Sequence, residues 1–490
     1  MRLNLLDICR LIGSVCVGMA PATALSNPSG AAIDSRAVKE GDLFFCLPGE
    51  RVDGHDFAAA AVEKGALAII GSRNPFGDGP SPAPVIVVDD VEKALGKIAL
   101  AHRKSTNAVV VGVTGTSGKT SVKEVLYSVL SENGETAKNP VNLNNQIGLP
   151  LSMCNASEDA AYWVIEAGIS RPHDMDELGE ILRPDVALIL NAGAGHVQEL
   201  GDKGVAHYKA RLLAHLAKNA YGPESFAVVS ADYPDLVREA ASYGKDVLWF
   251  SAEDAAQPYH AEYLGPDSAG GGKYSLVLKD AEFTVTAPFH GGYGAENVAA
   301  IGAAAHALGL TEVEIAEGFR KAELPNQRFA LRRAGSFLVI DDSYNANPLS
   351  MSRMLDAAAD MAKAEHVELI LVLGEMGELG PESPGFHREL GNYAAKLHPK
   401  TVYWKGGQGE AVAKGLRDGG FGGAFAPVAD ADDFMATFAH SGVEKAVVLF
   451  KGSRSNKLEE LVAAFMKGAE PAGAGKHPGK VPAKGKVDAV

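Results

Sequence analysis

The sequence feature that most constrains the fold is a glycine-rich loop between an apolar run and an amphipathic pattern. Residues 108–111 form a β-branched run that is too short for a helix, and Gly112 bounds it. The loop over 114–120 then leads into a segment whose apolar residues follow helical spacing. These residues are Val122, Val125, Leu126, Val129 and Leu130. A strand, a glycine loop and a helix in this order predict an α/β fold class.

The residue types in this loop indicate a phosphate-binding site. Glycines let backbone N–H groups approach phosphate oxygens, and a helix N-terminus favours negative charge. We expect Lys119 to bridge the β- and γ-phosphates and Thr120 to be a Mg²⁺ ligand. The standard phosphate-loop pattern would place its first glycine at Val113, whereas this chain has it one residue earlier. The predicted nucleotide-binding residues are Thr114, Gly115, Thr116, Ser117, Gly118, Lys119 and Thr120.

Alternating strand and helix patterns divide the chain into three units and a tail. Residues 1–106 read as a small α/β unit, and 107–328 as a second unit with a mainly parallel sheet covered on both faces. Residues 329–470 repeat this style, with apolar runs at 337–340, 369–373 and 446–450. Residues 471–490 are rich in Ala, Gly, Pro and Lys without an apolar period, which predicts a disordered tail.

Charge and cysteine content exclude several classes of protein. The 490 residues contain 46 Lys+Arg and 61 Asp+Glu, a net charge of −15, which argues against general adhesion to nucleic acid or to an anionic membrane. The four cysteines are scattered and form no C-x-x-C pair, so we expect reduced thiols rather than a disulfide scaffold or zinc site. No run of 18 or more uncharged apolar residues predicts a membrane span.

The first residues permit two interpretations. Arg2 and Arg10 precede an apolar run at 11–20, and 22–24 resembles a signal-peptidase site. The alternative is a short amphipathic helix over 3–12. Asp7 is unusual in an export leader, and nucleotide chemistry downstream needs the cytoplasm. We therefore expect the helix, and a cytoplasmic protein.

Five segments taken together resemble the Mur ligase family. The loop over 114–120 is similar to the family's phosphate loop, which also lacks the standard first glycine. The other segments are Asn142-Leu-Asn-Asn-Gln-Ile-Gly-Leu-Pro150, Asp341-Asp-Ser-Tyr-Asn-Ala-Asn-Pro348 with Ser350 and Met351, Leu373-Gly-Glu-Met-Gly-Glu-Leu-Gly380 with His387, and Lys451-Gly-Ser-Arg454. The similarity runs from Asp34 to Arg454 in the expected order, which covers nearly the whole chain.

The resemblance implies three domains with separate tasks and one reaction. Residues 1–106 would bind the UDP end of the substrate, 107–328 would bind ATP, and 329–470 would form a Rossmann-like domain for the incoming amine. ATP would phosphorylate the terminal carboxylate of UDP-N-acetylmuramoyl-tripeptide, and D-alanyl-D-alanine would attack the acyl phosphate, releasing phosphate. Phosphorylation fits this task because a carboxylate is a poor electrophile until it has a leaving group. The implied cofactors are ATP and Mg²⁺, and the implied partners are these small-molecule substrates. The resemblance also implies that the protein is a monomer.

Family motifs also imply roles for single residues. Beside Lys119 and Thr120, the metal and catalytic group comprises Glu166 and His196 as Mg²⁺ ligands and Lys209 as a carbamylated lysine. For the nucleotide, Asn297 lies near the adenine, Arg328 in the domain hinge, and Asp342 reaches in from the third domain. The implied substrate-binding residues are Ser35 and Arg36 for the uridine nucleotide, Asn144 and Asn145 for the peptide substrate, and Asn345 and Asn347 for the dipeptide.

Two alternatives stay open at this point. One is another amide ligase of the superfamily, either a different Mur ligase or a folylpolyglutamate-type ligase, which the 142–150 and 341–348 segments disfavour. The other is a non-catalytic nucleotide-binding relative, because the chain departs from the family pattern at 194–195, Arg211 and Tyr293. The sequence leaves open whether the third peptide residue is diaminopimelate or lysine.

Overall fold

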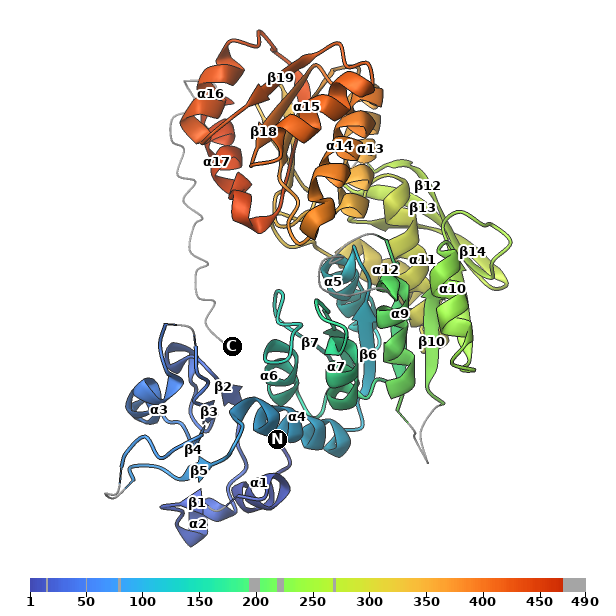
Figure 1. Cartoon of the computed structure of the whole chain (residues 1–490). Helices are drawn as coiled ribbons and strands as arrows, with labels where there is room; N and C mark the ends of the chain where they lie inside the picture. The colour runs from blue at the N-terminus through green and yellow to red at the C-terminus, as the bar shows by residue number, and fades with distance from the viewer. Residues whose placement is uncertain are drawn as a thin grey trace, which may run out of the picture.

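The computed structural model describes residues 1–14, 16–49, 51–77, 81–193, 203–217, 224–267 and 270–469. Within them, three sheets follow one another along the chain and along the long direction of the molecule (Figure 1). His196 and the predicted tail at 471–490 lie outside the described residues. The expected α/β fold, with mostly parallel sheets in three units, is confirmed.

The N-terminal unit is built on a five-stranded sheet in the order β1-β5-β4-β3-β2, in which only β1 is antiparallel. Its strands are β1 (Cys16–Val17), β2 (Ala31–Ala32), β3 (Leu43–Phe45), β4 (Ala68–Gly71) and β5 (Val85–Val87). Its helices are α1 (Leu5–Ile12), α2 (Pro21–Ala24), η1 (Ser35–Ala37), η2 (Gly54–Phe57), α3 (Ala58–Glu63) and α4 (Val91–Ser105). The helix expected near the N-terminus is present as α1, which Asn4 caps and Gly13 ends in a left-handed conformation.

The central unit contains a nine-stranded sheet in the order β14-β13-β12-β11-β10-β9-β6-β8-β7. Its strands are β6 (Val109–Thr114), β7 (Thr136–Lys138), β8 (Tyr162–Glu166), β9 (Val186–Ile189), β10 (Phe226–Ser230), β11 (Val247–Ser251), β12 (Tyr259–Pro266), β13 (Gly272–Leu278) and β14 (Ala281–Ala287). Its helices are α5 (Lys119–Leu130), α6 (Gly148–Cys154), α7 (Asp174–Leu182), α9 (Gly204–Ala210), η3 (Arg211–His215), α10 (Pro234–Ala241), α11 (Gly292–Ala307) and α12 (Glu312–Lys321). The strands from β7 to β12 are parallel, and β13 and β14 extend the sheet as antiparallel hairpins.

The position of β6 in this sheet explains where a site can form. β6 lies between β8 and β9 and is parallel to both. The carboxyl ends of the three strands therefore meet at one edge, and the loops that leave them converge there, as is usual for ligand sites in α/β sheets. Alternate residues of β6 enter apolar cores on opposite faces, since Val110 belongs to one core and Val111 to the other. The core that contains Val110 continues into the N-terminal unit.

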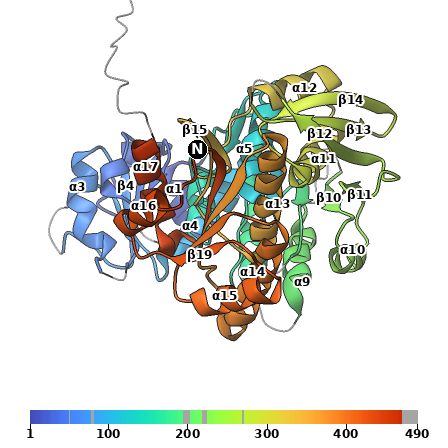
Figure 2. The ribbon, with the colours of Figure 1, turned by 90° about the horizontal axis from the view of Figure 1, so that it is seen from above.

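The C-terminal unit is a six-stranded sheet in the order β15-β16-β20-β17-β18-β19, covered by helices and parallel except for β15 (Figure 2). Its strands are β15 (Ala330–Ala334), β16 (Phe337–Asp342), β17 (Glu368–Gly374), β18 (Thr401–Lys405), β19 (Ala424–Pro427) and β20 (Ala446–Lys451). Its helices are α13 (Pro348–Ala364), η4 (Gly380–Glu382), α14 (Ser383–Lys396), α15 (Gly409–Asp418), α16 (Ala431–Ala439), η5 (Arg454–Asn456) and α17 (Leu458–Ala469). This sheet has its own two cores, which agrees with the Rossmann-like expectation.

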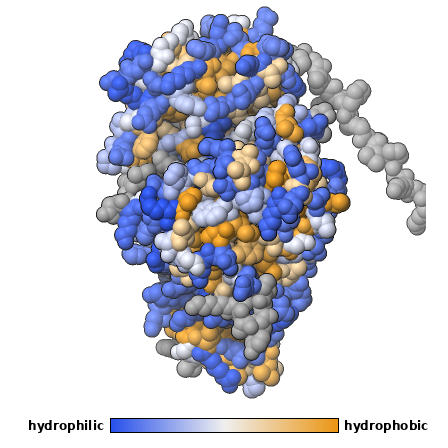
Figure 3. All heavy atoms as spheres, turned by 90° about the vertical axis from the view of Figure 1, so that its right-hand side faces the viewer, coloured by the Kyte–Doolittle hydropathy of each residue, from blue (hydrophilic) through white to orange (hydrophobic). Residues whose placement is uncertain are grey.

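The surface seen from the side is mostly hydrophilic, with apolar side chains in separate groups (Figure 3). Scattered apolar groups of this kind are normal for a globular surface. Among the helices of the described residues, none combines the length and the apolar character needed to cross a bilayer.

Candidate functional site

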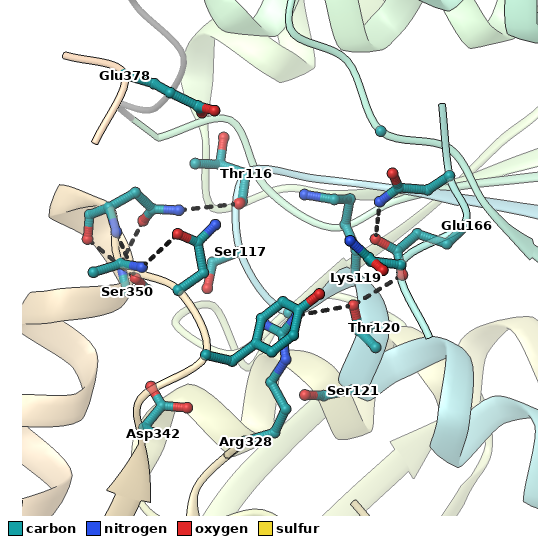
Figure 4. Close-up of a pocket in the computed structure, with 18 of the residues that line it drawn as sticks. Thr116, Ser117, Lys119, Thr120, Ser121, Glu166, Arg328, Asp342, Ser350 and Glu378 are labelled. Atoms are coloured by element: carbon teal, nitrogen blue, oxygen red, sulfur yellow. Dashed lines mark hydrogen bonds between the residues drawn. The ribbon is translucent and has the colours of Figure 1, made fainter. Parts of the chain in front are cut away.

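A pocket of about 460 Å³ lies where the central unit meets the C-terminal unit. The central unit lines it with the β6–α5 loop, the segment around Asn144 and the end of β8. The C-terminal unit lines it with residues that follow β16, with Glu378 and with Lys451. In Figure 4, Asp342 and Ser350 come from the C-terminal unit, while Lys119, Thr120 and Glu166 face them from the central unit. The pocket therefore joins segments that are more than 300 residues apart in the sequence.

The loop between β6 and α5 has the shape that its glycines permit. Gly118 adopts a left-handed φ of 84°, and a Cβ added there would lie 2.9 Å from Asn297 Oδ1. The backbone N–H groups of Thr116 and Ser117 each donate to Asn191 Oδ1 at 2.9 Å. The loop then opens into α5, whose first N–H groups have no partner within the helix and face the pocket side. This arrangement suits a bound phosphate.

Two lysines, the buried Lys209 and the half-buried Lys119, donate to one carbonyl of this loop. Lys119 Nζ and Lys209 Nζ each lie 2.9 Å from the backbone oxygen of Gly115. Burial lowers the pKa of Lys119, although the nearby Glu166 opposes this shift. Burial also lowers the pKa of Lys209 well below its ordinary value, and the neighbouring Lys119 charge adds to the effect. The site thus favours a neutral amine at Lys209.

An oxygen-rich chain of contacts runs from α5 to the end of β8. Thr120 Oγ1 donates to Glu166 Oε2 at 2.9 Å, and Asn144 Nδ2 donates to Glu166 Oε1 at 2.7 Å. Glu166 is 1 % exposed. Hydroxyl and carboxylate oxygens are the ligands that Mg²⁺ prefers, usually together with substrate phosphates. The described part of the chain contains no cluster of three or more His, Cys, Asp or Glu side chains that could hold a metal. Thr120 and Glu166 present adjacent oxygens of the kind that Mg²⁺ prefers.

Polar contacts join the hinge and the C-terminal unit to the loop, and others lie within the C-terminal wall of the pocket. Arg328 Nη2 donates to Thr120 Oγ1 at 3.3 Å, and its guanidinium stacks over the ring of Tyr344. Asn347, the N-cap of α13, donates from Nδ2 to the Thr116 carbonyl at 3.3 Å. Lys451 Nζ donates to Asp342 Oδ2 at 2.5 Å.

These contacts give the pocket a mixed charge. Lys451 also donates to the backbone oxygen of Asn345 at 3.0 Å, and burial lowers its pKa. Asp342 accepts a further bond from the backbone N–H of Phe329, next to the hinge. Acceptors and cations therefore lie on the same wall, opposite the phosphate loop.

The structure brings most of the predicted residues to this pocket, but not all of them. Asn144, Asn145, Asn297, Arg328, Asp342, Asn345 and Asn347 line it. Thr114 and Gly115 lie just behind it, at the end of β6. Ser35 and Arg36 lie in η1 of the N-terminal unit and do not line this pocket, and the Arg36 side chain, 88 % exposed, pairs with Asp34.

Sequence reasoning missed three residues that shape the loop. Asn191 holds the Thr116 and Ser117 amides, and its place just after β9, at the carboxyl end of a parallel strand, could have indicated it. Glu296 and Arg353 form a buried ion pair with 2.7 Å between Oε2 and Nη2. They lie on helices far apart in the sequence, where no local pattern marks them.

Comparisons with known proteins agree with this geometry. The family model for the Mur ligase middle domain matches residues 113–305, that for the Mur ligase glutamate ligase domain matches 327–454, and that for the Mur ligase family catalytic domain matches 29–103. The UDP-N-acetylmuramoyl-tripeptide--D-alanyl-D-alanine ligase of Escherichia coli is 32 % identical over 88 % of this chain and 92 % of that protein.

Two solved structures are similar over nearly their whole length. MurF from Acinetobacter baumannii has a TM-score of 0.80 and 27 % identity, covering 95 % of this chain and 98 % of that one. The MurF ligase from Thermotoga maritima in complex with ADP has a TM-score of 0.74 and 30 % identity, covering 89 % and 97 %.

Proposed function

The chain belongs to the Mur ligase family, and from this premise we propose that it joins D-alanyl-D-alanine to UDP-N-acetylmuramoyl-tripeptide at the expense of ATP. The observation that carries the proposal is the pocket between the phosphate loop and the C-terminal unit, because it can hold a nucleotide on one wall and an incoming amine on the other. Relatives that match most of the chain are named as this ligase, which favours it over the other amide ligases of the superfamily.

On the nucleotide side, the chain provides positive charge and fixed amides. The α5 N-terminus and Lys119 would bind the phosphates of ATP, and Lys119 would leave the Gly115 carbonyl to do so. Asn297 lies against Gly118, which supports its role beside the nucleotide. Arg328 would reach the phosphates from the hinge, because its guanidinium already contacts Thr120.

For the metal, we propose Thr120, Glu166 and His196 as protein contacts of Mg²⁺. Thr120 and Glu166 lie close enough to share one ion. When bound, Mg²⁺ would neutralise charge on the phosphates and polarise the transferring group. His196 lies outside the described residues, and its role rests on the family resemblance.

We propose that Lys209 becomes carbamylated. Its neutral amine would attack the carbon of CO₂, forming an N–C bond as one C–O π bond opens, and would release one proton, which turns a neutral side chain into an anion. The lowered pKa supports this step, since only the neutral amine is nucleophilic. Arg211, the departure from the family pattern near Lys209, directs its guanidinium to Asp176 at 2.7 Å. Asp176 therefore balances the positive charge of Arg211, which is directed away from Lys209.

For the reaction, the terminal carboxylate of the UDP-linked peptide would attack the γ-phosphorus, and ADP would leave. The amine of D-alanyl-D-alanine would then attack the acyl carbon, lose a proton and expel phosphate. Asp342, Asn345 and Asn347 would orient the nucleotide and dipeptide, and Asn144 and Asn145 the carboxylate-bearing peptide, because all five line the pocket. Closure of the pocket by the two units would exclude water from the acyl phosphate.

The UDP end of the substrate would bind the N-terminal unit. The exposed Arg36 suits a diphosphate, to which a guanidinium can donate two parallel bonds. We propose domains at 1–106, 107–328 and 329–470, with a disordered tail at 471–490. We further propose a monomer acting in the cytoplasm, where ATP is available, because the pocket is completed within one chain.

Release of inorganic phosphate tests this function. The purified chain with Mg·ATP should release phosphate only when UDP-N-acetylmuramoyl-tripeptide and D-alanyl-D-alanine are both present. Parallel assays with the lysine and the diaminopimelate tripeptides would identify the third peptide residue. Turnover of ATP at the same rate without the dipeptide would contradict the proposal, and no turnover with any combination would favour a non-catalytic relative.

A further inference from the structure

A buried polar network connects the C-terminal unit to the inside of the phosphate loop. Arg353, on the second turn of α13, forms an ion pair with Glu296 of α11 at 2.7 Å. Its Nη2 also donates to the Tyr233 hydroxyl at 2.5 Å. Glu296 is 3 % exposed, and its Oε1 has no hydrogen-bond partner among the described residues. The single cation from the other unit therefore balances a carboxylate that is almost fully removed from water.

Glu296 in turn fixes the orientation of one amide. Asn191 Nδ2 donates to Glu296 Oε2 at 3.1 Å. An ionised carboxylate only accepts hydrogen bonds, so it selects the NH₂ end of the asparagine. The oxygen end must then face the loop, where Asn191 Oδ1 accepts from the Thr116 and Ser117 amides at 2.9 Å. Asn191 Nδ2 also donates to the Ser117 carbonyl at 3.1 Å, so Glu296 and the loop together hold the amide in this orientation.

A second set of contacts brings the start of α13 onto the same loop. Asn347 donates to the Thr116 carbonyl at 3.3 Å. Leu349 lies so close to Gly193 that a Cβ there would be 2.8 Å from its Cδ2. Thr116 Oγ1 donates to the Gly193 carbonyl at 3.0 Å. The first two turns of α13 therefore contact the loop directly through Asn347, and indirectly through Arg353 and its partner Glu296.

We propose that Arg353 is a positioning residue that acts through Glu296 and Asn191 to set the shape of the phosphate loop when the C-terminal unit is docked. Without Arg353, Glu296 is a buried carboxylate with no cation, and it takes up a proton or draws in water. One of the two groups that hold Asn191 Nδ2 is then changed, and the acceptor of the Thr116 and Ser117 amides is less firmly fixed. Nucleotide binding at the loop is weakened as a result.

The proposal rests on the nucleotide-binding part of the proposed function but not on the ligase reaction. Binding of Mg·ADP to the full chain, measured by calorimetry without turnover, therefore tests it separately. Arg353→Met should weaken Mg·ADP binding about tenfold, which corresponds to the loss of a hydrogen-bonded charged contact. Arg333→Met is the matched control, because Arg333 forms an exposed ion pair with Glu365 in the same unit. This control should bind Mg·ADP as the unchanged chain does.

A double-mutant cycle shows whether the effect passes through Glu296. Glu296→Gln should also weaken Mg·ADP binding. The double variant with Arg353→Met should bind Mg·ADP no less tightly than the single variant with the lower affinity. If the double variant loses affinity by the product of the two single-variant factors, the two residues act independently and the proposal is overturned. Unchanged Mg·ADP affinity in Arg353→Met would also overturn it. A lower melting temperature with unchanged affinity would show a purely structural role and would also overturn it.

Arg353→Lys covers the case in which the methionine variant does not fold. Lysine keeps the charge but cannot span Glu296 and the Tyr233 hydroxyl as a guanidinium does. We expect about threefold weaker Mg·ADP binding with an unchanged melting temperature. Wild-type affinity in this variant would overturn the proposal.

Discussion

Replacing Lys209 by methionine should make the protein more stable while removing its activity. Lys209 is 1 % exposed, and in the described part of the chain no carboxylate forms an ion pair with it. Among the described residues, its one hydrogen bond goes to the Gly115 carbonyl, to which Lys119 also donates. Methionine has a similar length and no charge to bury. Removing buried charge in favour of an apolar side chain of similar volume can stabilise a protein by about 1–4 kcal/mol.

The sign of the pH dependence follows from the lowered pKa of Lys209. The unfolded chain holds this proton up to a pKa of about 10.4, whereas the folded chain releases it earlier. Stability of the unchanged protein therefore rises with pH in that window, by at most about 1.4 kcal/mol per pH unit. Lys209→Met removes this dependence. Its advantage should be largest on the acidic side of the window and should fall as the pH approaches 10.

A second buried lysine provides a control of opposite sign. Lys123 Nζ donates to the carbonyls of Asn139 and Val141 at 2.7 and 2.9 Å and pairs with Glu124 at 3.0 Å. Lys123→Met leaves these groups unsatisfied and should cost about 1–3 kcal/mol.

Thermal melts of both variants in CO₂-free buffer, from pH 7 to pH 10, measure the difference. Phosphate release in Lys209→Met should fall about a hundredfold or more, with partial rescue by short carboxylates if the carbamate acts there. A destabilised Lys209→Met, similar to Lys123→Met, would refute the reasoning about the buried charge.

Three further substitutions separate the parts of the site. Lys119→Ala should lower Mg·ADP affinity about a hundredfold in calorimetry with no loss of melting temperature, and retained affinity would reject the phosphate-loop assignment. Glu166→Gln should raise the Mg²⁺ concentration for half-maximal phosphate release about tenfold, and an unchanged Mg²⁺ titration would remove Glu166 from the metal site. Arg36→Ala should raise the KM for the UDP-linked substrate about tenfold and leave Mg·ADP binding unchanged, because Arg36 lies outside the nucleotide pocket; an unchanged KM would exclude it from substrate binding.

Local patterns predicted several of the parallel strands, such as β6 and β17, but missed the parallel strands β7, β18 and β19 and the antiparallel extension. The continuous apolar runs at β6, β17 and β20 are buried on both faces, so each was recognisable from its composition alone. The hairpins of β12, β13 and β14 alternate buried and exposed residues, and no strand was predicted there. An alternating pattern is a weaker signal for a strand than a continuous apolar run, because its interpretation depends on which face of the sheet the helices cover.

The same division holds for the site. The loop residues were found because a strand end, glycines and a helix start lie together in the sequence, whereas Glu166 was found because it matches a Mur ligase motif. Asn191, Glu296 and Arg353 became visible only when folding brought β9, α11 and α13 to one place. A buried ion pair between two units has no sequence signature, since each partner alone resembles a solvated helix residue.

The measurement that most directly tests the ligase reaction follows an oxygen atom. UDP-N-acetylmuramoyl-tripeptide with ¹⁸O at both oxygens of its terminal carboxylate is incubated with the chain, Mg·ATP and D-alanyl-D-alanine, and the released phosphate is analysed by mass spectrometry. Activation of the carboxylate by phosphorylation places one ¹⁸O in each phosphate, matched by one molecule of amide product. Unlabelled phosphate, formed at the same rate with or without the dipeptide, would show attack by water on ATP and would contradict the proposed reaction.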